Sequence, residues 1–236
     1  MEEDTINKKN IYNLNNLNNL TENNNNNNNN NKVSYNVSDL LKKISSLIDT
    51  CDYQLALQFS KKALSLENDN LKVLEILGMI EIELEIFEVD AEQKCEEYLN
   101  KALELDLLNP EVYQLLASVR LSQQRNDDAK IALEKSLDLW INLDPGHSSI
   151  PSYESRISLV KLLIELSQYT KALNVLEILQ KENDEVFDLW YLYGLCYFLM
   201  GQDSQNEQDR LTHWEDARDC LINYEKVIFY FLNKFF

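Results

Sequence analysis

Residues 187–201 read FDLWYLYGLCYFLMG, and this stretch carries the pattern that decides the fold. The bulky aromatic Trp190 is followed by a large and a small residue, Tyr193 and Gly194, and then by another aromatic residue, Tyr197. A small residue at this place predicts a close crossing with a second helix, and the large side chains beside it would fill the groove between the two helices.

The same frame recurs earlier in the chain, as Leu74, Leu77 and Gly78 and again as Tyr113, Leu116 and Ala117. A second helix follows in each repeat, with a small residue and, except after Ala56, where Ser60 stands, a bulky residue four positions later. The small residues are Ala56, Cys95, Ala129, Ala172 and Ala217, so the steps between them are 39, 34, 43 and 45 residues. A unit of about 34 residues built from two helices is typical of the tetratricopeptide repeat.

Three of these steps exceed the repeat unit and predict insertions of five, nine and eleven residues. The first lies around residues 85–90, the second in LDPGHSSIPS (143–152) and the third in the polar stretch QDSQNEQDRLTH (202–213). We read the second and third as loops. We therefore expect an all-α fold, an α-solenoid of about five tetratricopeptide-like helical hairpins, in which each hairpin buries the apolar face of its neighbour.

Composition divides the chain into three parts. In residues 1–36, 17 positions are Asn, which predicts a disordered leader, either a neutral expansion or a recruiting segment. Residues 37–228 form the predicted solenoid. Residues 229–236 are an aromatic C-terminal tail, which would either fold onto Tyr224 and Leu221 or mark a truncated terminus.

Charge and motif content exclude several classes of function. The chain has 22 Lys and Arg against 40 Asp and Glu, a net charge of -18, which disfavours direct binding of nucleic acid. It has only 4 Gly and contains no phosphate-binding loop, metal-ligand motif or catalytic constellation, so we expect no cofactor and no enzyme activity. No signal peptide or bilayer-spanning stretch is present, which favours a location in the cytoplasm and nucleus without a membrane partner. We also expect a monomer.

The first helices of the hairpins are expected to line a groove with an acidic rim. Residues 81–106 hold ten acids and two lysines, either as a solvated outer face or as a seat for a Lys/Arg-rich segment. The groove positions, the fifth and ninth of each first helix, are Leu41, Glu75, Gln114, Ile157, Tyr191, Ser45, Met79, Ser118, Lys161 and Leu195. Only Lys161 is cationic, which disfavours an adaptor for the carboxylate tails of heat-shock chaperones.

Repeat phase gives a set of candidate client-binding residues. Glu111 and Asp188 would pair with client Lys and Arg, Tyr191 and Phe198 would pack on the stems of those side chains, and Arg120 would join neighbouring helices. The full candidate set is Glu75, Glu83, Glu111, Glu165, Asp188, Tyr191, Leu195 and Phe198.

Four stretches go beyond a generic repeat. They are FEVDAEQKCEEYLNKALELD (87–106), VYQLLASVRLSQQRNDDAK (112–130), PSYESRISLVKLLIELSQYTKALNVLEILQKENDE (151–185) and VFDLWYLYGLCYFLMG (186–201). Together they resemble the family of assembly chaperones dedicated to large-subunit ribosomal protein L-4, over roughly residues 50–201. The resemblance implies a protein without enzyme activity that binds the newly made basic ribosomal protein, shields its long rRNA-binding loop and delivers it to pre-ribosomes.

This chain departs from the family near residue 87, where the family carries one more repeat before the acidic stretch. The groove would be shorter by that repeat. The competing hypothesis is a general tetratricopeptide scaffold that assembles folded partners.

Overall fold

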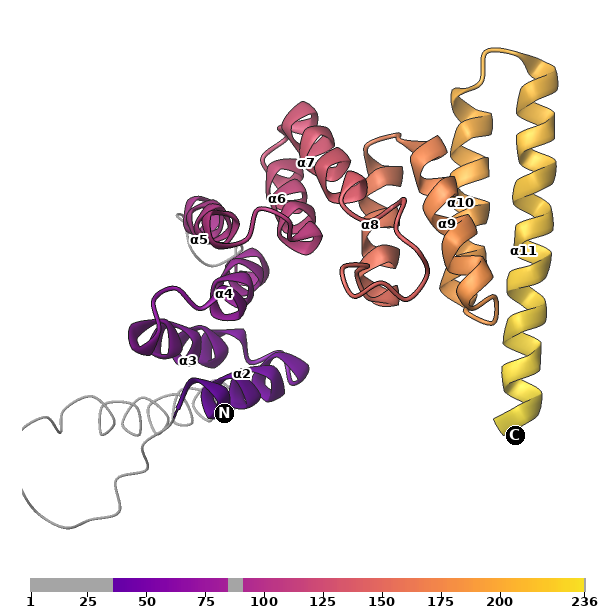
Figure 1. The fold of residues 1–236 in the computed structure, drawn as a ribbon. Helices are drawn as coiled ribbons and strands as arrows, with labels where there is room; N and C mark the ends of the chain where they lie inside the picture. Colours follow the sequence, from indigo (N-terminus) through magenta and orange to yellow (C-terminus); the bar gives the residue numbers. More distant parts are fainter. Residues whose placement is uncertain (1–35, 85–90, 236) are drawn as a thin grey trace, which may run out of the picture. The chain divides into compact units, whose positions relative to one another are not determined.

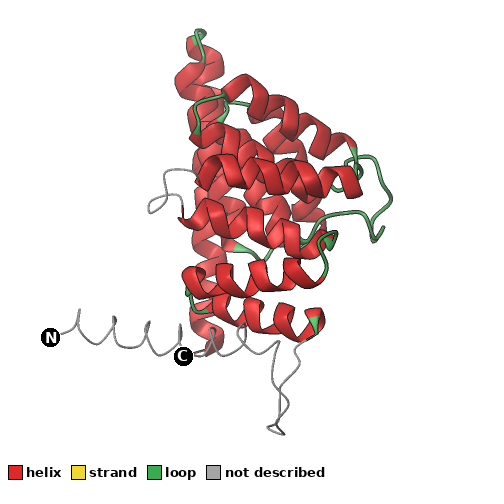
Figure 2. Ribbon diagram, turned by 90° about the vertical axis from the view of Figure 1, so that its left-hand side faces the viewer, coloured by secondary structure: helices red, strands yellow, loops and turns green. Residues whose placement is uncertain are grey.

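The computed structural model describes residues 36–84 and 91–235, which belong to one compact unit. This part of the chain is built from α-helices without any strand, as Figures 1 and 2 show. The helices are α2 (Val37–Asp49), α3 (Tyr53–Leu66), α4 (Leu71–Leu84), α5 (Ala91–Leu105), α6 (Pro110–Ser122), α7 (Asn126–Asp138), α8 (Tyr153–Glu165), α9 (Tyr169–Glu182), α10 (Phe187–Asp203) and α11 (Glu207–Phe235). None of these helices is both long and apolar enough to cross a bilayer.

Successive helices pair into five hairpins, and each hairpin packs on the next, so the predicted all-α solenoid is confirmed. The first helices of the hairpins are α2, α4, α6, α8 and α10. Each of them begins seven residues before the same frame position, which is Ile44, Gly78, Ala117, Val160 and Gly194 in turn. The repeat frame read from the sequence therefore gives the start of every first helix.

Side-chain caps explain several of these starts. The Oδ1 atom of Asn36 accepts a hydrogen bond from the backbone N–H of Asp39 at 2.8 Å, and Ser152 caps α8 in the same way. Asn109 caps α6, where Pro110 occupies the first turn and lacks only an N–H that would have no partner in the helix. Asn36 thus belongs to α2, although we placed it in the leader. The predicted disorder of residues 1–35 lies outside the described residues.

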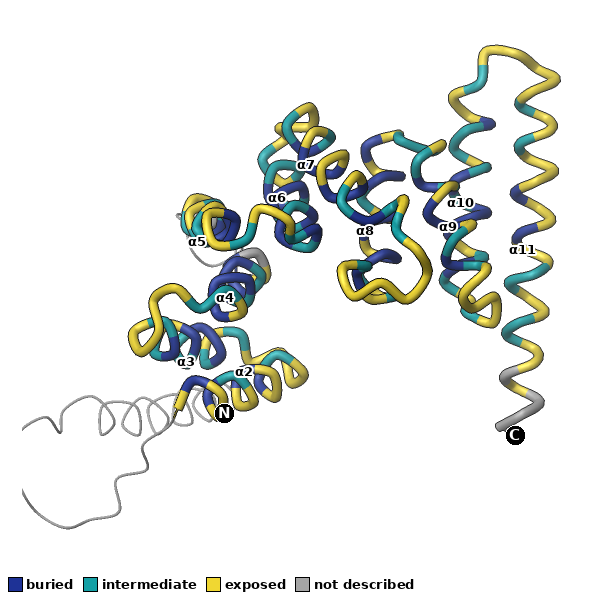
Figure 3. Tube along the Cα trace, in the orientation of Figure 1, coloured by how far each residue is buried: buried dark blue, intermediate teal, exposed yellow. Residues whose placement is uncertain are grey.

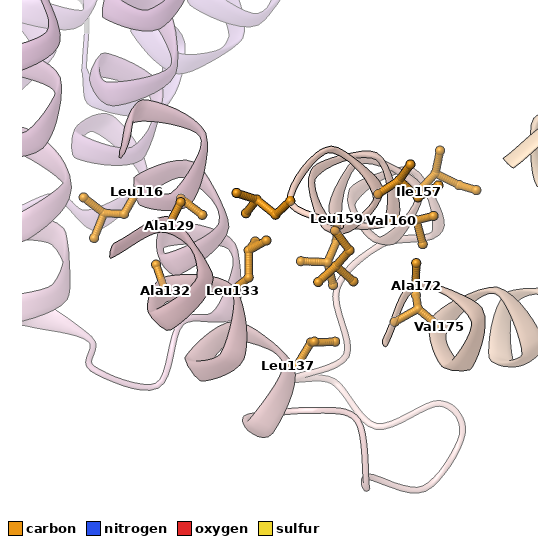
Figure 4. Close-up of a cluster of buried hydrophobic side chains, with 14 of the residues drawn as sticks. Leu116, Ala129, Ala132, Leu133, Leu137, Ile157, Leu159, Val160, Ala172 and Val175 are labelled. Atoms are coloured by element: carbon orange, nitrogen blue, oxygen red, sulfur yellow. The ribbon is translucent and has the colours of Figure 1, made fainter. Parts of the chain in front are cut away.

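The core runs along the line where the hairpins meet. Leu116 of α6 and Leu133 of α7 are each 1% exposed, and they pack in the same buried cluster as Leu159 and Val160 of α8. Figure 4 shows the side chains of α7 and α8 pointing toward one another across this junction. Because each hairpin covers the apolar side of the one before it, stability depends on contacts between neighbours.

The second and third predicted insertions have different outcomes. Residues 143–152 form turns between α7 and α8, as predicted. Just before them, Trp140 is 2% exposed and its ring lies 5.9 Å from the guanidinium of Arg156. The buried Trp140, which follows α7, therefore packs against Arg156 of α8 next to the loop.

The prediction of a long polar loop at residues 202–213 is wrong. α10 continues to Asp203 and α11 begins at Glu207. The extra residues lengthen both helices because Gly201 lets the indole of Trp214 lie against α10, where its Nε1–H donates to the carbonyl of Phe198 at 3.3 Å. A polar sequence is compatible with this arrangement because most of α11 remains exposed.

The C-terminal residues continue α11 without a break at residue 228. Phe229, Tyr230 and Leu232 are between 49% and 59% exposed. The predicted tail is thus an extension of the last helix as far as residue 235. The first insertion, around residues 85–90, and the family's additional repeat at that point lie outside the described residues.

The four cysteines predict a simple reactivity pattern. Cys51 is exposed, whereas Cys95, Cys196 and Cys220 are buried. Burial raises the pKa of Cys196 to about 12 and that of Cys220 to about 11, so at pH 8 very little thiolate forms at either site. With a thiol reagent at pH 8 we expect one fast reaction, at Cys51, and three further reactions only after urea is added. Fast modification of Cys196 in the folded protein would contradict this packing.

Candidate functional site

The first helices lie side by side and present one common surface. The side-chain amide of Asn109, at the start of α6, donates to Oε1 of Glu75 on α4 at 2.6 Å, and Gln114 of α6 donates to the carbonyl of Ser155 on α8 at 3.0 Å. Residues at the second, sixth, ninth and thirteenth positions of a helix share one face. On α8 all four are exposed, namely Glu154, Ser158, Lys161 and Glu165. We call this surface of α4, α6, α8 and α10 the A-helix face.

Acids occupy both ends of the A-helix face. Glu111, Glu154 and Asp188 lie in the first turns of their helices, and Glu83 and Glu165 lie at the last turns of α4 and α8. The rise of a helix puts the two rows roughly 16 Å apart. An acid in the first turn stabilises a helix through its interaction with the helix dipole, and an acid in the last turn destabilises the helix. Helix stability therefore accounts for the first row and does not account for Glu83 and Glu165.

The carboxylates of these acids are available to a ligand. Within the described residues, none of the five side chains forms an ion pair or accepts a side-chain hydrogen bond. Glu83, Glu154 and Glu165 are exposed, and Glu111 and Asp188 are partly exposed. A flexible segment that carries several Lys or Arg residues could engage both rows.

The acidic stretch at residues 81–106 is divided between surface and interior. Glu81 is fully buried with Nζ of Lys61 3.7 Å from its Oε1, and Glu96 pairs with Arg120 at 3.3 Å and Arg125 at 3.1 Å. Glu83, Glu97 and Glu104 are exposed, while the acids at 85, 88 and 90 lie outside the described residues. The stretch is therefore neither entirely a solvated outer face nor entirely a seat for a Lys/Arg-rich segment, because Glu81 and Glu96 form ion pairs within the protein.

Arg120 joins neighbouring helices, as its place in the repeat predicts. Its Nε lies 3.3 Å from Oε1 of Glu96 on α5, and one of its terminal nitrogens donates to the carbonyl of Asp128 on α7 at 3.3 Å. Arg125 reinforces the same junction with two hydrogen bonds of 3.1 Å to Glu96. This network occupies one acid of the predicted seat.

Glu75 does not reach the surface that we predicted for it. It is 9% exposed, and its carboxylate already accepts from Asn109 and pairs with Lys72 at 3.2 Å. Two further residues at the fifth position, Gln114 and Ile157, are also buried, at 9% and 7% exposed, whereas Leu41 is half-buried and Tyr191 is exposed. At Glu75 and Gln114 the fifth position contacts the next hairpin, so the prediction that these residues line the groove is wrong.

Tyr191 and Phe198 also lie away from the A-helix face. The ring of Tyr191 is 6.3 Å from that of Tyr224, and the ring of Phe198 is 6.4 Å from that of Trp214, so both are directed toward α11. They are 50% and 45% exposed because no described helix follows α11. The structure brings Glu83, Glu111, Glu165, Asp188 and Leu195 onto the common face, and separates Glu75, Tyr191 and Phe198 from it.

Glu154 was missing from the sequence-based set. It holds the same repeat position as Glu111 and Asp188, so applying the frame to every second position would have found it. The charges of Glu154 on α8 and Asp188 on α10 both act on the neighbouring Tyr153. Its pKa is raised, first by burial, then by the charge of Glu182, with a smaller contribution from Asp188.

Comparison with known proteins agrees with the repeat fold. A family model described as tetratricopeptide repeat matches residues 110–139. The chain is 44% identical over 123 residues to "Probable assembly chaperone of rpl4" from Emericella nidulans and 38% identical over 145 residues to the protein of the same name from Schizosaccharomyces pombe. These matches cover 52% and 61% of this chain but only 32% and 42% of the two relatives.

Solved structures give the same result. "Assembly Chaperone of RpL4 (Acl4) (Residues 1-338)" matches with a TM-score of 0.54 and 31% identity, over 70% of this chain and 59% of that one. "YrrB: a TPR protein with an unusual peptide-binding site" matches with a TM-score of 0.52 at 17% identity, over 82% of this chain and 90% of that one, and shows the fold alone.

The chain folds as an α-solenoid of tetratricopeptide-like helical hairpins. Over the aligned residues it is homologous to the assembly chaperones of rpl4, which confirms the resemblance read from the sequence. The chain spans about a third to two fifths of the length of these curated relatives.

Proposed function

We propose that this protein is a dedicated chaperone that binds newly made large-subunit ribosomal protein L4. The observation that carries the proposal is the 44% identity over 123 residues to a protein named as an assembly chaperone of rpl4. The unpaired carboxylates of the A-helix face support it, because a basic client needs acidic partners that are not already engaged within the protein.

The chaperone would act by temporary charge replacement. Carboxylates at both ends of the A-helix face would stand in for rRNA phosphates along the basic internal loop of the client and keep it from RNA and from other chains. Release would follow on pre-ribosomes because rRNA offers a denser negative surface. Such an exchange needs no catalytic group and no direct contact of the chaperone with nucleic acid. We place the cycle in the cytoplasm, where the client is made, and in the nucleus, where it is delivered.

Binding of purified ribosomal protein L4 at rising salt tests this function. We expect a complex at low salt that weakens steadily as salt increases, since attraction between exposed charges is screened. A general scaffold would instead retain folded partners at high salt and show no preference for this client. Absence of a complex with ribosomal protein L4 at low salt would overturn the proposal.

Reversing two surface acids tests the A-helix face itself. We expect Glu83→Lys together with Glu165→Lys to weaken client binding at low salt by about tenfold, because each change replaces an attraction with a repulsion. Both residues lie at helix C-termini, where a lysine favours the helix dipole, so the fold should be retained. The measurement is fluorescence anisotropy with a labelled peptide of the client's basic loop.

The matched control is Glu104→Lys together with Asp138→Lys. These exposed acids lie at the C-terminal ends of α5 and α7, the second helices of their hairpins, so the change in net charge and in helix environment is the same. We expect little loss of binding. Equal losses in the two variants would show that only total charge matters and would remove the A-helix face from the binding site.

A further inference from the structure

One side of α11 carries a stripe of large exposed apolar residues. They are Leu211 (48% exposed), Trp214 (40%), Leu221 (48%), Ile222 (43%), Phe229 (59%) and Leu232 (49%). On a helix of 3.6 residues per turn these six lie within an arc of about 100°. The helix surface beside the stripe is polar, with Thr212, Glu215, Asp219 and Lys226, and the buried Ala217 and Cys220 lie on another side of the helix. We call the six residues, with Arg218 and Glu225 between them, the α11 stripe.

The equivalent surface is covered in the preceding hairpins. Leu99, Leu133 and Leu176 hold the repeat position of Leu221, and each is at most 1% exposed. All three leucines belong to the buried cluster that runs through the hairpins, whereas Leu221 is 48% exposed. α11 packs on α10, and none of the other described helices covers its stripe (Figures 1 and 3). The stripe is thus the continuation of an interface that is closed elsewhere in this chain.

The residues of the stripe have a nearly symmetric order along the helix: apolar residues stand at both ends and in the centre, and one charged residue stands on each side of the central pair. If two copies of α11 are laid antiparallel with Leu221 opposite Ile222, then Trp214 faces Phe229 and Leu211 faces Leu232. The same register places Arg218 opposite Glu225, twice, on either side of the axis. Each of the six apolar residues of the stripe then meets an apolar residue, and Arg218 and Glu225 meet their opposite charges.

We propose that α11 pairs antiparallel with α11 of a second copy of this chain, around a two-fold axis between Leu221 and Ile222. A two-fold interface uses the same patch on both copies, so it must be self-complementary, and the α11 stripe meets that requirement. The apolar residues supply the driving force and the two Arg218–Glu225 pairs specify the register. The side chain of Arg218 is 66% exposed and, among the described residues, pairs only with its neighbour Asp219, so it is accessible to a partner.

Dimer formation through α11 leaves the A-helix face uncovered, so the inference is independent of the proposed function. It departs from the monomer that we expected from the sequence. The two kinds of association also respond to salt in opposite ways. Client binding should weaken with salt, whereas two copies that each carry -18 should associate better when their overall repulsion is screened.

The mass of the purified chain in solution tests the proposal. By sedimentation equilibrium we expect twice the chain mass of 27.7 kDa, and a dimer that becomes tighter with salt. Leu221→Glu should shift the chain to the monomer. The control is Leu107→Glu, because Leu107 is 66% exposed on the connection between α5 and α6 and should leave the dimer intact. A monomer at every concentration and salt, or a dimer that Leu221→Glu leaves unchanged, would overturn the proposal.

Charge exchange tests the register. Arg218→Glu and Glu225→Arg, each alone, place like charges opposite one another and should raise the dimer dissociation constant about tenfold or more. Mixing the two single variants should restore a heterodimer, and combining both changes in one chain should restore the homodimer. Failure of both restorations would rule out this antiparallel register. If the wild-type chain is a monomer and Leu221→Glu weakens salt-resistant binding of the client, the stripe serves the client and the second copy is excluded.

Discussion

Leu176→Ala is expected to lower the free energy of unfolding by about 2–5 kcal/mol, the usual cost of a large-to-small change in a packed core. Leu176 of α9 is fully buried in the cluster that runs through the hairpins. The same change at the same repeat position of α11, Leu221→Ala, is expected to cost about 1 kcal/mol or less, because Leu221 is 48% exposed. The difference between the losses of unfolding free energy in the two variants measures how much a following hairpin stabilises a leucine at this repeat position.

Urea denaturation followed by far-UV circular dichroism provides the measurement. The chain should be dilute enough to be monomeric, so that association through α11 does not add to the effect of Leu221→Ala. Wild-type protein at the same dilution is the reference. Equal losses for the two leucines would mean that burial between neighbouring hairpins is not the main source of stability.

Gly78→Ala and Gly194→Ala are expected to have opposite signs, although both glycines occupy the same frame position. A methyl group at Gly78 would lie 2.6 Å from Cδ2 and 2.8 Å from Cγ of Leu99, which is fully buried and has no room to retreat. We expect overpacking to destabilise this variant by about 1–3 kcal/mol.

At Gly194 the nearest atoms, the carbonyl oxygen of Ala217 and Cδ2 of Leu221, would be 3.4 Å from the added methyl group. That space is enough, so the higher helix propensity of alanine should dominate and stabilise the protein by up to about 1 kcal/mol. The pair is compared by urea denaturation with wild type. Destabilisation of both variants to the same extent would contradict the different helix crossings of the two hairpins.

The repeat frame made most of the fold predictable. Gly78, Ala117 and Gly194 stand at helix crossings, and helix starts follow from the frame because every hairpin packs on its neighbour in the same way. The stretch at residues 202–213 misled us because its polar composition is typical of loops. Its helical form depends on a contact between Gly201 and Trp214, which lie thirteen residues apart in the chain. Composition does not reveal such a contact.

The candidate site was predictable only in part. Repeat phase placed Glu111, Asp188, Glu83 and Glu165 on one surface because a helix face depends only on spacing. It also placed Glu75 there, which is wrong, because the partner of Glu75 is Asn109 from the next hairpin. Which acids are paired inside the protein depends on residues distant in sequence. Arg120 and Arg125, for example, lie 24 and 29 residues from Glu96.

The sequence by itself determined the class of fold, the number of hairpins, the starts of their first helices and the homology to assembly chaperones, since all of these follow from local periodicity and residue identity. The tertiary structure alone decided which acids are free, that Tyr191 and Phe198 turn toward α11, and that the apolar side of α11 is left uncovered. The physical reason is that burial and pairing are set by the neighbouring hairpin. The same leucine position is closed in α5, α7 and α9 and open in α11, where no described helix follows.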